Sequence, residues 1–140
     1  MLRQLAPFLW YGLIFASSSK TVNGEMIDKA IRRRAPGERG ERLSKLWGKA
    51  WWLPVKGWHA TEFAILYGLF RYAGRSKAEA LARVAVAASL DEYHQTFVEG
   101  RTGTPRDVLI DLGGALAAAG VETLLEPEPT LLDRLPLPRR

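Results

Sequence analysis

One histidine and a small set of acids have the residue types and spacing that proton transfer requires. His59 and Glu62 stand three residues apart, and Asp91 and Gln95 stand four residues apart. Each pair shares one face of its segment if that segment is helical. An imidazole close to carboxylates is the combination that general acid–base catalysis uses. We therefore take these residues as candidates for a catalytic site.

A second set of polar residues has the types that hold a charged substrate in place. Asp107 and Asp111 are again four residues apart, and Arg101 precedes them in a segment that contains Gly100 and Pro105. A guanidinium group binds a phosphate or neutralises a carboxylate through paired hydrogen bonds. We expect Arg101 to do one or the other, and Asp107 also has the position of a helix-stabilising acid near a helix N-terminus.

Four apolar stretches rich in Ala and Leu must position these side chains. Their composition is typical of helices rather than strands, and they predict helices over approximately residues 2–18, 57–73, 78–98 and 107–125. The fold class expected is all-α: a small, membrane-embedded, antiparallel four-helix bundle. In such a bundle the end of the first helix, the start of the second, the end of the third and the start of the fourth lie on one side. Ser17–Ser19, His59, Asp91 and Asp107 occur at those four ends, so we expect one shared polar pocket.

Hydropathy leaves two environments open for this bundle. Each stretch approaches the length that spans a bilayer, but acids interrupt the runs, and the mean hydropathy of the chain is −0.11. A soluble bundle and a membrane bundle with a polar interior both fit. The first stretch also has features of a signal peptide, with Arg3 before the apolar run and Ala16 near a small-residue site.

The positive charge of the chain is concentrated between the first two stretches. Residues 20–56 hold ten basic and four acidic residues, and the whole chain has a net charge of +5. Within this segment, residues 41–52 place apolar side chains at helical spacing, which predicts a short amphipathic helix lying at a membrane interface. Its apolar residues are Leu43, Leu46, Trp47, Ala50 and Trp51. A solvated basic loop is the alternative for the segment as a whole, and the anionic partner expected is lipid rather than nucleic acid.

Residue counts restrict the chemistry further. The chain has no cysteine and only two histidines, which excludes thiol chemistry and a three-histidine metal site within one chain. A di-metal carboxylate site usually carries Glu-x-x-His twice, whereas this chain has His59-x-x-Glu62 once. We expect no metal and no other cofactor. His94 is expected to be a surface residue, and the proline-rich residues 126–140 are expected to form a tail outside the domain at 1–125.

Four sequence motifs resemble the VanZ family of small bacterial integral membrane proteins, from about residue 9 to 121. A serine cluster ends the first helix, Lys-x-x-His opens the second, Asp-Glu-x-x-Gln-x-Phe ends the third, and Gly-Arg precedes an Asp that opens the fourth. The matching residues are Ser17–Ser19, Lys56, His59, Asp91, Glu92, Gln95, Phe97, Gly100, Arg101, Asp107 and Gly114. The chain departs from the family pattern at Val55, where Asp is usual, at Glu62, where an aromatic residue is common, and at Asp111, where Asn is usual.

The resemblance implies a multi-pass protein of the bacterial cell membrane whose partner is a membrane lipid or a lipid-linked envelope precursor. It implies an enzyme that hydrolyses or transfers lipid headgroups or lipid-linked glycans, or else a non-catalytic protein that binds such a lipid and contributes to resistance to the glycopeptide teicoplanin. On the first hypothesis, His59, Glu92 and Asp91 are catalytic, with Glu92 orienting His59. The expected substrate-binding residues are Ser18, Lys56, Gln95, Arg101, Asp107 and Asp111. The positive-inside rule predicts that the basic segment, and with it the pocket, faces the cytoplasm.

Overall fold

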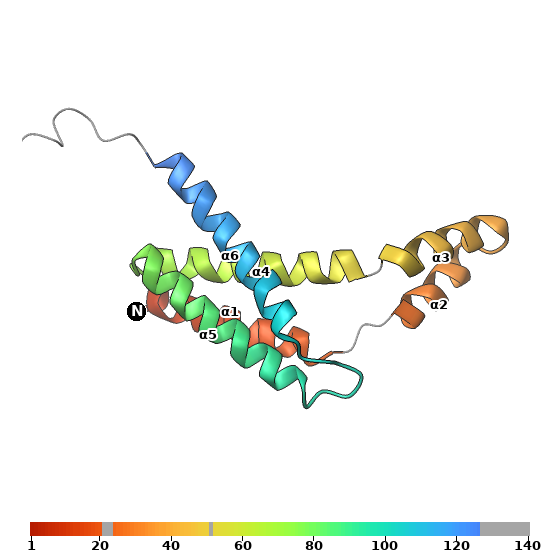
Figure 1. Cartoon of the computed structure of the whole chain (residues 1–140), viewed down its shortest axis with the longest axis horizontal. Helices are drawn as coiled ribbons and strands as arrows, with labels where there is room; N and C mark the ends of the chain where they lie inside the picture. Colours follow the sequence, from red (N-terminus) through yellow and green to blue (C-terminus); the bar gives the residue numbers. More distant parts are fainter. Residues whose placement is uncertain (21–23, 51, 127–140) are drawn as a thin grey trace, which may run out of the picture.

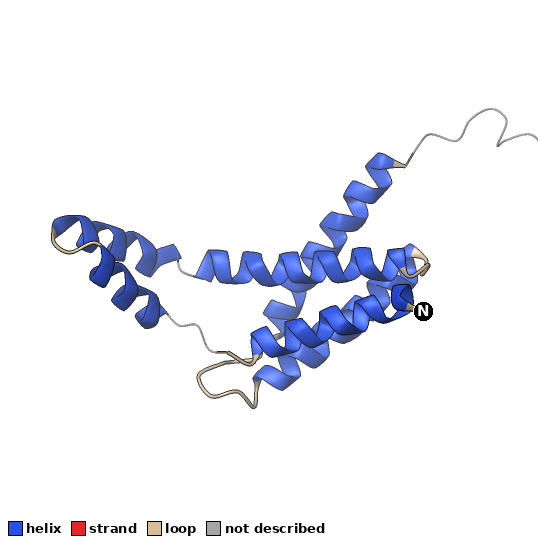
Figure 2. Ribbon diagram, turned by 180° about the vertical axis from the view of Figure 1, so that it is seen from behind, coloured by secondary structure: helices blue, strands red, loops and turns tan. Residues whose placement is uncertain are grey.

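The computed structural model describes residues 1–20, 24–50 and 52–126, and the regular structure in these residues is entirely helical (Figure 1, Figure 2). The all-α class expected from the sequence is therefore confirmed. In chain order the helices are α1 (Leu2–Ser18), α2 (Gly24–Arg34), α3 (Glu38–Ala50), α4 (Trp52–Tyr72), α5 (Lys77–Gln95) and α6 (Pro105–Leu125). The expected tail falls almost wholly on residues 127–140, outside the described part of the chain.

Helices α1, α4, α5 and α6 pack on one another around an apolar core. The core contains Ile14 from α1, Phe63 and Leu66 from α4, Val84 from α5 and Ala115 from α6, all of them fully buried. Polar contacts also join α1 to its neighbours, because Trp10 Nε1 donates to the Glu62 carbonyl at 2.9 Å. Figure 1 shows α6 crossing over α4, with its C-terminal part extending beyond the other helices. The regular antiparallel bundle expected from the sequence is therefore not confirmed.

The crossing of α4 and α6 depends on a glycine. A Cβ atom added at Gly114 would overlap the backbone carbonyl of Ala60, so only glycine allows the two helices to approach so closely here. Small residues at a helix–helix contact permit this kind of approach. The close contact lies two turns from Pro105, where α6 begins, and it therefore fixes the start of α6 against the first half of α4.

Local signals define the starts of α4, α5 and α6, of which α4 and α6 carry the site at these ends. Ser76 and Glu79 form a capping box at the start of α5, with Ser76 N donating to Glu79 Oε2 at 2.9 Å. Thr104 caps α6 through the Asp107 N–H at 3.3 Å, and Pro105 occupies the first turn. Helix α4 begins at Trp52, five residues before the expected start at 57, because Pro54 falls in its first turn, where the missing N–H breaks no helical bond.

Helices α2 and α3 form a basic hairpin that stands apart from the packed helices, next to the start of α4 (Figure 1, Figure 2). Asp28 joins the two, because its carboxylate accepts from Arg32 Nε at 2.8 Å and from the Ser44 hydroxyl. Helix α2 was not expected, and α3 is shifted toward the N-terminus relative to the expected 41–52. Leu43 and Leu46 are exposed on α3, as an interfacial helix requires; Trp51 lies outside the described residues.

One helix in the described part of the chain is long and apolar enough to cross a membrane. An 18-residue window of α6 has a mean hydropathy of 1.7, and only 17% of that window is buried inside the protein. Most of α6 is therefore exposed rather than packed among the other helices. Helices α1, α4 and α5 do not meet the same criterion, so the expectation of several spans receives no support from hydropathy.

Candidate functional site

A polar cavity of about 200 Å³ lies where the start of α4, the end of α5, the loop at 96–104 and the start of α6 meet. Its lining residues come from all four of these segments. They are Trp52, Val55, Lys56, His59, Glu92, Gln95, Gly100, Arg101, Thr102, Asp107, Ile110 and Asp111. The structure thus brings seven of the residues named from the sequence as site residues together in one cavity: Lys56, His59, Glu92, Gln95, Arg101, Asp107 and Asp111.

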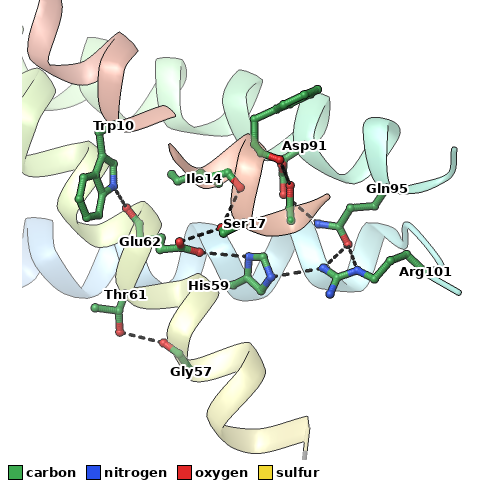
Figure 3. A network of polar contacts seen from close by, with 12 residues as sticks. Trp10, Ile14, Ser17, Gly57, His59, Thr61, Glu62, Asp91, Gln95 and Arg101 are labelled. Carbon is green, nitrogen blue, oxygen red and sulfur yellow. Dashed lines mark hydrogen bonds and ion pairs between the residues drawn. The ribbon is translucent and has the colours of Figure 1, made fainter. Parts of the chain in front are cut away.

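His59 is the central titratable group of the site, and its side chain is 14% exposed. Its Nε2 lies 3.3 Å from Arg101 Nη2, and its Nδ1 lies 3.5 Å from Glu62 Oε2 (Figure 3). A guanidinium group only donates hydrogen bonds, so Nε2 accepts and the imidazole proton lies on Nδ1. This places Glu62, not Glu92, beside the protonated nitrogen.

Glu62 is held from the other side by α1. Its Oε1 lies 3.0 Å from Ser17 Oγ, as Figure 3 shows. The 3.5 Å approach of His59 Nδ1 and Glu62 Oε2 does not have hydrogen-bond geometry, and both atoms are buried without a hydrogen-bond partner among the described residues. The i, i+3 spacing predicted that His59 and Glu62 share a face, but sequence analysis gave Glu62 no specific catalytic or binding role.

Arg101 is positioned by a chain of hydrogen bonds that begins on α1. Ser18 Oγ donates to Asp91 Oδ1 at 2.6 Å, and Gln95 Nε2 donates to Asp91 Oδ2 at 2.8 Å. Gln95 Oε1 then accepts from Arg101 Nη2 at 2.7 Å and Nε at 3.1 Å. Asp91 is fully buried and does not line the cavity, so its expected place inside the pocket is wrong. It instead orients the amide that holds the guanidinium group.

Lys56 supplies the cation that neutralises an acid across the cavity. It forms an ion pair with Asp107, so that α4 and α6 are linked at the cavity wall. Neutralising an acid was one of the two roles expected for Arg101, but Arg101 makes no ion pair among the described residues. The backbone geometry explains the difference, because Lys56 lies one turn before His59 on α4 and faces the first turn of α6.

Glu92 fastens the loop to α5. Its Oε2 accepts from the Thr104 backbone N–H at 2.8 Å, immediately before α6. A Cβ atom added at Gly103 would overlap the Glu92 carbonyl, so the loop also packs directly on the α5 backbone. Glu92 makes no contact with His59 in the described structure, and its expected role in orienting that residue is not supported. Sequence analysis missed Thr104 as a site residue, although the Thr-Pro start of a helix marks it as a cap.

Asp111 is the most deeply buried acid of the cavity wall. It is 2% exposed, and its Oδ2 has no hydrogen-bond partner in the part of the chain that the structure describes. His94, by contrast, lies outside the cavity, where it stacks on Phe15 and lies 3.0 Å from Ser19 Oγ. No group of three His, Asp or Glu side chains among the described residues is arranged to hold a metal ion.

The site can therefore present one imidazole, two cations and three carboxylates to a bound molecule in a space of about 200 Å³. The guanidinium and ammonium groups suit a phosphate, while the imidazole suits proton transfer. Comparison with known proteins gives one match: the family model described as VanZ/LLP1 covers residues 5–126. No curated protein and no solved structure matches the chain.

Proposed function

The chain belongs to the VanZ/LLP1 family, and we propose that it is a bacterial membrane protein whose cavity binds the phosphate-bearing headgroup of a lipid or a lipid-linked envelope precursor. The observation that carries this proposal is the fixed guanidinium group of Arg101, which lies beside His59 in a polar cavity. Lys56 adds a second cation to the same wall. Phosphate recognition by an arginine held in a defined orientation needs no further cofactor.

Exposed apolar side chains support a position in the membrane for the whole helical core. Outward-facing residues on α1 include Phe8 and Leu9, which are 62% and 69% exposed, and α6 has Leu116 and Leu124 in the same situation. A soluble protein rarely exposes apolar side chains in contiguous patches of this kind. We infer that α1, α4 and α5 accompany α6 across the bilayer, and that the basic hairpin lies on the cytoplasmic side.

We further propose that the site hydrolyses a phosphodiester of the headgroup, with His59 as the acid–base. His59 Nε2 would take a proton from a water molecule as the water oxygen bonds to phosphorus. The bond from phosphorus to the leaving alcohol breaks, and the same proton passes from His59 to the alcohol oxygen. The bound phosphate would accept the Arg101 N–H, which frees Nε2 for this proton. Glu62, near Nδ1, would stabilise the imidazolium ion.

A second candidate function is binding without turnover, in which the protein shields an envelope lipid and contributes to glycopeptide resistance. One observation favours it: Nε2, the nitrogen that must act as the base, already accepts from Arg101. If the phosphate does not displace that contact, His59 has no basic nitrogen available, and the site only binds.

The experiment that tests the proposal is incubation of the purified protein in detergent with a bacterial lipid extract, followed by mass spectrometry of the lipids. The wild type should convert one lipid class to a product that ends in a phosphomonoester, and His59→Ala should not. His94→Ala is the matched control, because His94 lies outside the cavity, and it should retain activity. Retention of a lipid without conversion would support the second candidate; no retention and no conversion would refute both.

A further inference from the structure

A second hollow lies next to the polar cavity, between the end of α1, the α2–α3 hairpin and the start of α4. This groove has a volume of about 620 Å³. Val55, His59 and Arg101 line both the groove and the polar cavity, so the two spaces are adjacent at the candidate catalytic group. The remaining lining residues of the groove are Leu13, Ala16, Ser17, Lys20, Ile27, Trp47, Pro54 and Trp58.

The groove has the chemistry of a site for hydrocarbon. Apart from Ser17, Lys20 and the two shared polar residues, its lining is aliphatic or aromatic. It is formed partly by the hairpin, whose basic residues would lie among lipid headgroups. A lipid hydrocarbon chain in the groove therefore lies in apolar surroundings as far as Arg101 and His59. The phosphate attached to that lipid would then lie next to these two side chains.

The volume of the polar cavity limits the size of the headgroup attached to the phosphate. Its volume of about 200 Å³ equals that of about seven water molecules, at about 30 Å³ each. That space accommodates a phosphate and a small group, whereas drug-sized ligands occupy about 300–1,000 Å³. A phospholipid with a compact headgroup fits within this space.

The charges of the cavity wall indicate the nature of that small group. Asp111 Oδ2 is buried without a hydrogen-bond partner among the described residues, and Glu92 lies on the same wall. Leaving a buried carboxylate unpaired is costly. An ammonium group of the ligand would supply the missing donor, while Arg101 holds the phosphate.

We propose, on the basis of the function proposed above, that the groove and the cavity form one site for a phospholipid with a small zwitterionic headgroup. The hydrocarbon chain lies in the groove, the phosphate binds Arg101, and the ammonium group binds Asp111. Phosphatidylethanolamine has this chemistry, whereas phosphatidylglycerol with the same acyl chains carries a glycerol group in place of the aminoethyl group and has no amine.

The test is native mass spectrometry of the full chain in detergent, with each of these two lipids titrated at the same mole fraction. Free O-phosphoethanolamine is titrated separately as a ligand without a chain. The wild type should bind phosphatidylethanolamine about tenfold more tightly than phosphatidylglycerol, as expected for one charge-assisted contact. Asp111→Asn should remove this preference, and Glu126→Gln, at the other end of the α6 region, should retain it.

The groove is tested by Ala16→Trp, which fills it, against Leu9→Trp, which adds the same side chain to an exposed position of α1. Ala16→Trp should weaken the binding of both lipids about tenfold and leave the binding of free O-phosphoethanolamine unchanged. Leu9→Trp should affect none of the three ligands.

Each result is assigned to one part of the proposal. Equal binding of the two lipids by the wild type would overturn the amine subsite, and normal lipid binding by Ala16→Trp would overturn the groove. In both cases, loss of binding in Arg101→Gln would leave the proposed function standing. Unchanged binding of both lipids by Arg101→Gln would instead overturn the proposed function itself.

Discussion

Charged side chains gather at both ends of the packed helices, but the two clusters are built differently. At the end opposite the cavity, Glu122 of α6 accepts from Arg71 Nε at 2.7 Å and from the Tyr67 hydroxyl. Lys77 Nζ lies 2.8 Å from Glu126 Oε2. Each acid of this cluster therefore has a donor. At the cavity end, Glu62 Oε2 and Asp111 Oδ2 have none within the described residues.

The difference separates a cluster that holds helices together from one that is arranged for a ligand. Buried polar groups in native proteins are almost always hydrogen-bonded, and each exception calls for an explanation. The Arg71–Glu122 cluster is complete without any other molecule. The cavity cluster is complete only when a further donor enters, and this contrast leads to four predictions.

The largest effect is expected for lipid binding when the arginine of each cluster is replaced. Arg101→Gln should weaken binding of phosphate-bearing lipids about 100-fold, because it removes a charge-assisted contact made in a secluded site. Arg71→Gln should leave lipid binding unchanged and lower thermal stability instead. Lipid titration and thermal unfolding of both variants in detergent would measure these effects. Loss of binding in Arg71→Gln would remove the distinction between the two ends.

The next effect concerns the hydroxyl groups that support each cluster. Ser18→Ala should destabilise the protein by about 1–2 kcal/mol, because it leaves one oxygen of the buried Asp91 without its donor. It should also weaken lipid binding, since Asp91 orients Gln95 and Gln95 orients Arg101. Tyr67→Phe removes the matching hydroxyl at the other end and should affect stability alone. Equal lipid affinity in Ser18→Ala and the wild type would contradict the positioning role of Asp91.

A smaller effect, with opposite signs at the two ends, is expected when a carboxylate becomes an amide. Asp111→Asn removes a buried carboxyl group whose Oδ2 has no partner and should raise stability by about 1 kcal/mol, or the midpoint of thermal unfolding by about 3 °C. Glu122→Gln breaks an ion pair and should lower that midpoint. Thermal unfolding without added lipid measures both. A fall in the midpoint for Asp111→Asn would mean that Asp111 has a partner in the folded protein.

The smallest effect is expected in the hairpin, whose acid Asp28 is fully paired. The Ser44 hydroxyl, followed by Arg32, lowers the pKa of Asp28 below its ordinary value of 3.8. The pairing therefore contributes its full stabilisation above that value and loses it as the pH falls through the lower pKa of the folded state. Circular dichroism during acid titration should show a loss of helix in the wild type below about pH 4. The helix content of Asp28→Asn should not change over the same pH range.

The long helices and their meeting point could be predicted from the sequence because both depend on local pattern. The apolar stretch at 2–18 corresponds to α1, and Glu92, Asp107 and Asp111, at the end of α5 and the start of α6, do line one cavity. Helix α2 could not be predicted, since six of its eleven residues are charged and its contacts with the rest of the hairpin come from α3. The oblique path of α6 was also missed, because it depends on the space available at Gly114 and not on any periodicity.

The pairing of charges within the site was the least predictable feature. The sequence predicted that Arg101 and Lys56 lie near the acids, but the choice of partner depends on directions that only packing determines. Lys56 on α4 pairs with Asp107 on the neighbouring helix α6. Gln95, and not an acid, lies next to Arg101. Glu62 was a candidate without a specific role, because its place beside His59 is defined only when Ser17 of α1 binds the other carboxylate oxygen.

The loop that carries Arg101 is fastened to α5 at its far end, by the Glu92–Thr104 hydrogen bond and by the close packing of Gly103. Its conformational entropy is therefore lost when the chain folds, before any ligand arrives. Immobilising one long side chain on binding costs about 0.5–1.5 kcal/mol, and Arg101 largely avoids this cost because Gln95 already holds it. The same rigidity prevents the wall from yielding, so a headgroup even slightly larger than the cavity should be rejected by steric exclusion rather than by weaker attraction.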